Sequence, residues 1–168
     1  IAYGNGQYDA IKGVNATSPV RVTGYENAGG GPDSVAVNGD KVVLAYNATA
    51  KEIRIINISN LASPALVSTV EIPTGAVDVE FSHDLIAVAA QSGGCKIINA
   101  ETLASPTIVS TISGSSDCQD VAFFKDRFLL ALFASGTLRL YDLVAPQTPV
   151  QLASYDIGSS IGDFQKMN

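Results

Sequence analysis

The chain has 168 residues, of which 46% are hydrophobic and 15% are charged, and its formal net charge is −6. This length suits one compact domain with a sizeable core, and the composition excludes a disordered chain. The ten Lys and Arg residues are scattered and form no basic patch, which argues against binding to nucleic acid or to an anionic membrane surface. No apolar run reaches the roughly 18 residues that a membrane helix needs.

The first 27 residues predict three strands that match the last three strands of a longer unit found later in the chain. Ala2 and Tyr3 align with Ala45 and Tyr46, and a Ser-Pro pair ending at Pro19 aligns with the pair ending at Pro64. The chain opens at Ile1 inside a strand pattern, so we expect that something upstream has been removed.

Three complete units follow, and each begins with a hairpin. Their first strands start 44 and 42 residues apart, at Ser34, Asp78 and Asp120. Six residues after each start comes an aspartate, and an apolar run follows it: Asp40, Asp84 and Asp126. A strand, a tight polar turn and a second strand are the signature of a β-hairpin.

Each unit continues with a third and a fourth strand. The third strands are predicted at 52–57, 95–99 and 137–142, and a Ser/Thr-Pro pair precedes each fourth strand. Proline is tolerated at strand starts and sheet edges, which predicts that the fourth strand is the outer edge. The second strands are apolar almost throughout, which indicates sheets that are buried on both faces.

These features predict an all-β fold, a β-propeller of four-stranded antiparallel blades in repeats of about 42–44 residues. We expect no helix and one domain, residues 1–168, with the following units: about 1–30 (partial), 31–74, 75–116, 117–159, and 160–168 as the first strand of the next or closing blade. Three alternatives remain for how the ring of blades is completed. In the first, the last strand joins the N-terminal blade and closes the ring within this chain. In the second, the chain is part of a larger propeller, and in the third, several copies of the chain assemble.

The segments IRIINISNLASPALVSTVEI, CKIINAETLASPTIVSTIS and LRLYDLVAPQTPVQLASYDI resemble the LVIVD repeat. The resemblance covers the whole chain and implies a propeller of the kind found mainly in secreted and cell-surface proteins, without a shared chemistry. The chain departs from the pattern at one turn, where Asn57, Asn99 and Gly13 occupy the family's Asp position and Asp142 alone keeps it.

The candidate metal site consists of the residues that open the first strands, which should line a central channel: Asp78, Asp120, Asp163 and Ser34. Like charges about 7 Å apart repel by roughly 2 kcal/mol at an effective dielectric constant of about 20. A Ca²⁺ ion would relieve this repulsion, because carboxylate and hydroxyl oxygens suit a hard cation. In the alternative, each aspartate accepts hydrogen bonds from the backbone of the neighbouring blade.

Cys95 and Cys118 are the only cysteines. Both stand at strand starts on the same side of the predicted blades, so a disulfide typical of an oxidising compartment is one interpretation. Cys95 also replaces an apolar residue of the other units, so a buried free thiol is the other. The lone histidine, His83, falls in a hairpin turn beside Asp84 and is interpreted as a solvated turn residue.

Three Asn-X-Ser/Thr sequons are glycosylation candidates, at Asn15, Asn47 and Asn57. Sugar binding usually relies on exposed aromatic residues, and because the chain has no Trp the candidates are Tyr3, Tyr8, Tyr25 and Tyr46.

No residues form a recognisable catalytic set, so we predict a non-catalytic secreted or surface-displayed propeller, an interaction, adhesion or structural module without an organic cofactor. Its expected partners are a protein or an extracellular polymer, with self-assembly as a further possibility, and no nucleic acid. The alternative is a propeller that binds a small ligand or carbohydrate, with a cation in the central channel.

Overall fold

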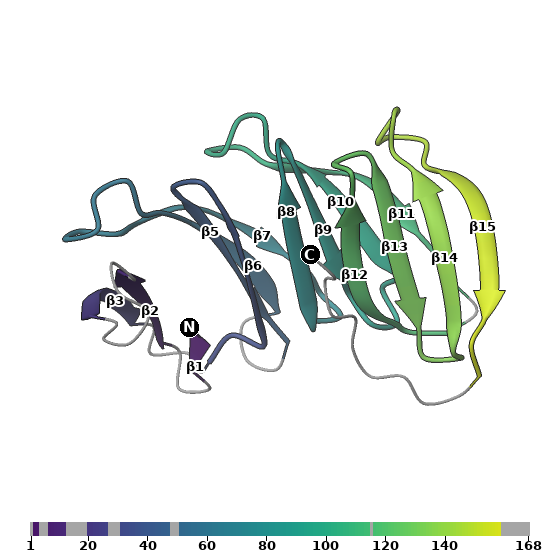
Figure 1. The fold of residues 1–168 in the computed structure, drawn as a ribbon, viewed down its shortest axis with the longest axis horizontal. Coiled ribbons are helices and arrows are strands. Elements are labelled where there is room, and N and C mark those ends of the chain that lie inside the picture. The colour runs from purple at the N-terminus through teal and green to yellow at the C-terminus, as the bar shows by residue number, and fades with distance from the viewer. Residues whose placement is uncertain are drawn as a thin grey trace.

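The computed structural model describes residues 31–47, 51–114 and 116–158 in full, together with the backbone of three strands nearer the N-terminus (Figure 1). The three are β1 (Ala2–Tyr3), β2 (Gln7–Lys12) and β3 (Val20–Glu26), and they form an antiparallel sheet in the order β1-β2-β3. The strand predicted at 160–168 lies outside the described residues.

The other strands form three four-stranded antiparallel sheets, each made of strands that are consecutive in the chain. The first sheet contains β4 (Ser34–Asn38), β5 (Lys41–Tyr46), β6 (Glu52–Asn57) and β7 (Ala65–Glu71). The second contains β8 (Asp78–Ser82), β9 (Leu85–Ala89), β10 (Cys95–Asn99) and β11 (Thr107–Ile112). The third contains β12 (Cys118–Phe124), β13 (Phe128–Phe133), β14 (Thr137–Asp142) and β15 (Val150–Asp156). The predicted all-β fold with four-stranded antiparallel sheets is confirmed for the described residues, among which no helix is found, so none that could span a membrane.

The sheets follow one another across the molecule in chain order, from the β1–β3 sheet at one end to β15 at the other (Figure 1). The first strands lie next to each other, since β8 contacts both β4 and β12. The fourth strands β7, β11 and β15 form the opposite edges of their sheets, where the prolines preceding them predicted an edge. Within the described part of the chain, these sheets form an open series and not a closed ring.

The core lies between the sheets, and the second strands β5 and β9 each contribute to two separate clusters. In β9, Ile86 and Val88 pack toward the first sheet against Ile53, while Ala87 and Ala89 pack toward the third sheet against Leu129. Successive side chains of a strand point to opposite faces, so a strand that is covered on both faces must be apolar at every position. This double burial explains the continuous apolar runs of the sequence.

A β-bulge recurs at the same place in all four sheets. The register between the third and fourth strands shifts after Ile55, after Ile97 and after Leu140, and the register between β2 and β3 shifts after Ala10. A bulge adds an unpaired residue and increases the local twist. The shared position identifies β1–β3 as the same kind of unit as the complete sheets.

A turn stabilised by a side chain follows each third strand. The Oδ1 atoms of Asn57, Asn99 and Asp142 accept hydrogen bonds from the backbone N–H two residues later, at 2.8, 2.8 and 2.9 Å. Asn and Asp both supply this oxygen, so Asn57 and Asn99 form the same turn as Asp142. Asp142 also pairs with Arg127, and this hydrogen-bonded guanidinium lowers the pKa of the carboxyl below its usual value.

Candidate functional site

Asp78 joins three sheets at the inner strands. Its Oδ1 accepts a hydrogen bond from the Ser34 hydroxyl of β4 at 2.8 Å, and its Oδ2 accepts one from the Val121 N–H of β12 at 3.1 Å. One carboxylate on β8 is therefore bonded to the sheet before it and to the sheet after it. These are the contacts expected of a residue that fixes the junction between blades.

The other members of the predicted metal site are placed as follows. Asp120 is buried, with 6% of its surface exposed, and Asp163 lies outside the described residues. In the described part of the chain, no three His, Cys, Asp or Glu side chains gather closely enough to hold a metal ion. The hydroxyl of Ser34, the predicted hydroxyl ligand, donates a hydrogen bond to Asp78.

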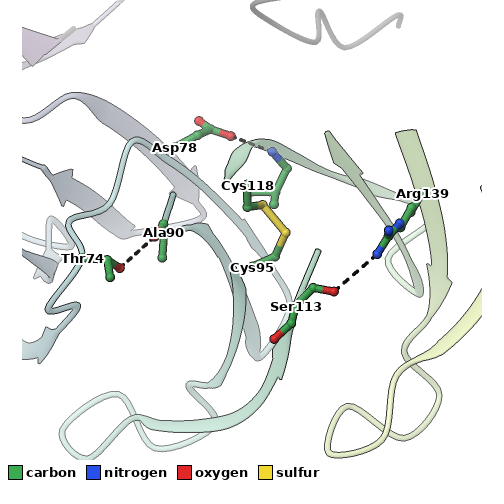
Figure 2. Close-up of a disulfide and its surroundings, with 8 residues drawn as sticks. Thr74, Asp78, Ala90, Cys95, Ser113, Cys118 and Arg139 are labelled. Carbon is green, nitrogen blue, oxygen red and sulfur yellow. Dashed lines mark hydrogen bonds between the residues drawn. A yellow bond between two sulfur atoms is a disulfide. The ribbon is translucent and has the colours of Figure 1, made fainter. Parts of the chain in front are cut away.

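Cys95 and Cys118 form a disulfide that connects β10 of the second sheet to β12 of the third. The two Cα atoms are 5.7 Å apart, and both residues are fully buried in the cluster between these sheets. Gln91 and Cys118 also exchange backbone hydrogen bonds at 3.1 and 2.9 Å across the same boundary. Figure 2 shows the bridge between the two sheets, with Asp78 close to the Cys118 end. The inner part of this junction is thus held covalently as well as by hydrogen bonds.

One group of polar side chains that converge on a hollow lies at the hairpin turns of the three complete sheets. A groove of about 310 Å³ opens there, and we call it the rim groove; its lining residues are Asn38, Phe81, Ser82, His83, Phe123, Lys125 and Asp126. The Ser82 hydroxyl donates to Asp126 Oδ1 at 2.6 Å, and His83 Nδ1 lies 3.6 Å from the same oxygen. The groove therefore offers an imidazole, a carboxylate and an ammonium group beside two buried phenyl rings.

Three non-glycine residues of the rim groove have left-handed backbone conformations. Tight hairpin turns require a positive φ, and the first hairpin meets this requirement with Gly39 at φ 58°. The second and third hairpins meet it with His83, Lys125 and Asp126, at φ 48°, 50° and 54°. The left-handed conformation costs an ordinary residue about 1–2 kcal/mol, less for His and Asp than for Lys. The two later hairpins thus carry polar side chains at positions where glycine would be less strained.

Several residues singled out in the sequence lie elsewhere. Tyr46, a predicted sugar-stacking residue, is fully buried, and this prediction is wrong because the ring packs in a core cluster under the Arg54 guanidinium, 4.8 Å from the ring centroid. The side chains of the other three candidate tyrosines lie outside the described residues, as does Asn15.

The two remaining sequon asparagines are both half-buried. Asn47 packs closely against Gly75, where a Cβ atom would lie 2.2 Å from Asn47 Oδ1. The Oδ1 atom of Asn57 is already bonded in its turn. His83 was interpreted as a solvated turn residue, and 72% of its side chain is exposed.

Ser82 and Lys125 of the rim groove are residues that sequence reasoning missed. The signal is present in the repeat itself, because the first hairpin of every unit must lie at the same end of its sheet. An alignment of the turn residues of successive units pairs Ser82 with Asn38, and Lys125 with Gly39 and His83.

Sheets of four antiparallel strands that follow one another around a common set of inner first strands define the β-propeller class. No protein-family model and no curated protein matches the sequence. Solved structures support the fold: BamB from Moraxella catarrhalis has a TM-score of 0.70 at 14% identity, over 92% of this chain and 44% of that chain. A protein from Lactobacillus plantarum has a TM-score of 0.72 at 16% identity, over 88% of this chain and 48% of that one. The computationally designed protein Ika4 has a TM-score of 0.62 at 18% identity, over 80% of each chain.

The chain spans less than half the length of the BamB and Lactobacillus plantarum chains that it matches. At these low identities, the likeness concerns the arrangement of the sheets.

Proposed function

We propose that the chain is a non-catalytic β-propeller of the LVIVD-repeat kind, displayed at the cell surface or secreted, and that it serves as an interaction, adhesion or structural module. The rim groove is the binding surface of this module. The observation that supports it most is that His83, Lys125 and Asp126 keep exposed polar side chains in a strained backbone conformation. Strain of this kind gathers at binding sites more often than elsewhere.

Two features support an extracellular location. A disulfide links the second and third sheets, and disulfides persist mainly in oxidising compartments. The sequons at Asn15, Asn47 and Asn57 provide acceptors for N-linked glycans. Expression through a secretory pathway followed by enzymatic deglycosylation tests this location, and an unchanged mass after deglycosylation would contradict the predicted glycoprotein.

Replacing the strained rim residues by glycine separates binding from folding. Glycine adopts a positive φ without strain, so His83→Gly and Lys125→Gly should leave the protein folded, with a melting temperature close to that of the wild type. The same variants remove two of the polar side chains of the groove, the imidazole and the ammonium group. Cross-linking in the native material should therefore retain the protein or polymer neighbours of the wild type and lose them in the double variant.

The matched control places the same change at the opposite end of a sheet. Lys51→Gly alters an exposed residue that also has a positive φ, 51°, between β5 and β6, and should leave the cross-linked neighbours unchanged. Equal capture by the wild type and the His83→Gly/Lys125→Gly variant would exclude the rim groove as the binding surface. A wild type without any neighbour would argue against an interaction module altogether.

A second candidate function is the binding of a small ligand or carbohydrate in the same groove. Phe124, half exposed beside Lys125, places an accessible aromatic ring next to the polar rim residues, and aromatic faces commonly stack against ligand rings. A glycan array without hits and a metal analysis without a bound cation would reject this function, including the form of it that has Ca²⁺ in the channel.

A further inference from the structure

A second hollow adjoins the rim groove at the ends of the first and second sheets. It has a volume of about 350 Å³ and lies between the turn of the first hairpin and the segment that follows β10; we call it the second groove. Asn38, Phe81 and His83 line both hollows, and the Asn38 side chain donates a hydrogen bond to the His83 carbonyl at 3.2 Å. The two hollows therefore form one continuous trough that passes His83.

Hydrogen bonds hold the far wall of the second groove in place. The Ala100 N–H donates to the Asp84 carbonyl at 2.8 Å, so the segment after β10 lies beside the turn of the second hairpin. The Ser68 hydroxyl donates to the Leu103 carbonyl at 2.6 Å, which ties the same segment to β7 of the first sheet. Two sheets thus support this wall.

Two carboxylates of the second groove have no side-chain partner. Of the three aspartates in the hairpin turns, Asp40 pairs with Lys41, and Asp126 accepts a hydrogen bond within the rim groove. The side chains of Asp84 and Glu101 form no ion pair or hydrogen bond with any described residue, and both are exposed. Because Lys41 is already paired, the second groove carries an excess of negative charge.

Apolar side chains lie next to these carboxylates. Leu103 packs against the core between the first two sheets, and Phe81 belongs to that core. Both line the second groove. An apolar wall beside carboxylates suits the side chain of Lys or Arg, whose aliphatic stem covers apolar surface while its charged end stays among polar groups and water. The rim groove, at the other end of the trough, instead carries the exposed ammonium group of Lys125.

We propose that the trough binds an extended segment of a partner protein, and that a Lys or Arg side chain of this segment lies between Asp84 and Glu101. This subsite rests on the proposed function of the rim groove, across which the rest of the segment runs. Charge complementarity selects the occupant. The chain has a net charge of −6 and the second groove is acidic, so a basic side chain is attracted there and an anionic polysaccharide is repelled.

NMR titration of the isotopically labelled chain with three capped tripeptides tests this subsite. The peptides are acetyl-Gly-Lys-Gly-amide, its Arg analogue, and a norleucine analogue that has an apolar stem without a charge. The Lys and Arg peptides should shift the amide signals of Asp84, Ala100 and Glu101. The norleucine peptide should bind about fivefold more weakly, since exposed ion pairs contribute modestly to affinity.

The variant Asp84→Asn/Glu101→Gln keeps the shape of both side chains and removes their charges. It should weaken binding of the Lys peptide about fivefold, to the level of the norleucine peptide. Both residues are exposed, so the fold should persist, and a circular dichroism spectrum verifies this. The matched control, Glu71→Gln/Asp156→Asn, removes two exposed carboxylates at the ends of β7 and β15, away from the hairpin turns. It changes the net charge equally and should bind the Lys peptide like the wild type.

Three results would overturn the subsite: no shift with any peptide, equal binding of the Lys and norleucine peptides, or equal binding of the Lys peptide to the wild type and Asp84→Asn/Glu101→Gln. The test of the rim groove is separate. If His83→Gly/Lys125→Gly loses its cross-linked neighbours while no peptide binds near Asp84, the proposed function stands and the subsite fails. If the Lys peptide binds as expected while that variant keeps every neighbour, the subsite stands and the rim groove is not the binding surface.

Discussion

At the scale of single residues, Asp78 is the side chain on which the inner edge of the sheets depends. Its two carboxylate oxygens bind β4 and β12 at once. Hydrogen bonds to a charged group contribute about 1.5–3 kcal/mol each, so we expect Asp78→Ala to lower the free energy of unfolding by about 3 kcal/mol. Asp78→Asn should cost less, since its amide oxygen still accepts one of the two bonds. Equilibrium unfolding in urea measures both changes.

The control for this prediction is Asp84→Ala, in the exposed turn of the hairpin that Asp78 begins. An exposed turn residue should change the free energy of unfolding by no more than about 0.5 kcal/mol. If Asp84→Ala and Asp78→Ala proved equally destabilising, the junction role of Asp78 would be wrong.

Asn99 permits a second test at this scale, because the equivalent position of the third sheet carries an Asp, Asp142. Asn99→Asp should be nearly neutral, since Asp142 forms the same turn in the third sheet. Asn99→Ala removes the acceptor for the Glu101 N–H and should cost about 1 kcal/mol. Thermal melts of the two variants distinguish them, and equal losses would show that the side-chain oxygen does not stabilise the turn.

The sequence predicted where these residues lie better than what they contact. Asp78 was expected at the start of a first strand, and the structure has it there. Whether its carboxylate meets a metal ion or a backbone N–H depends on Val121, 43 residues away, whose N–H is directed by the packing of two sheets. Tyr46 was expected at the surface as a sugar-binding candidate. The strand pattern does not show which end of a strand is covered by a neighbouring part of the protein, so the burial of this ring could not be predicted.

At the scale of elements, the disulfide between β10 and β12 is the strongest tie between two sheets. It closes a loop over a sequence separation of 23 residues, and a cross-link of that span stabilises a fold by about 3 kcal/mol. We expect the variant Cys95→Ala/Cys118→Ala to lose about this much in urea unfolding while keeping a β-sheet spectrum. Reduced wild-type protein should behave in the same way. Free thiols in the native, oxidised protein would contradict the bridge.

The strands themselves were predictable, whereas the bulges were not. Alternation fails in this chain because both faces of the inner sheets are covered, yet length, turn residues and the prolines at 64, 106 and 149 still marked each strand. The bulge between Ile97 and Ile98 left no trace, since two adjacent isoleucines face opposite sides with or without a register shift.

At the scale of the whole molecule, the number of blades in a ring could not be predicted from the repeats. A repeat of 42–44 residues fixes what one blade contains, but the number of blades depends on the small rotation at each junction. That rotation is the sum of many contacts, such as Ile55 against Ile86 and Ile97 against Leu129, and no single residue specifies it.

The bulge shared by all four sheets has a consequence for how such a chain can change length. Each third strand restores its own register with the fourth, so an error in one sheet does not pass to the next. Duplicating or deleting an entire repeat leaves every remaining ladder intact, whereas inserting one residue into a third strand turns its apolar side chains to the wrong side. This architecture should therefore accommodate the gain or loss of a complete blade of about 43 residues more readily than a one-residue insertion into a third strand.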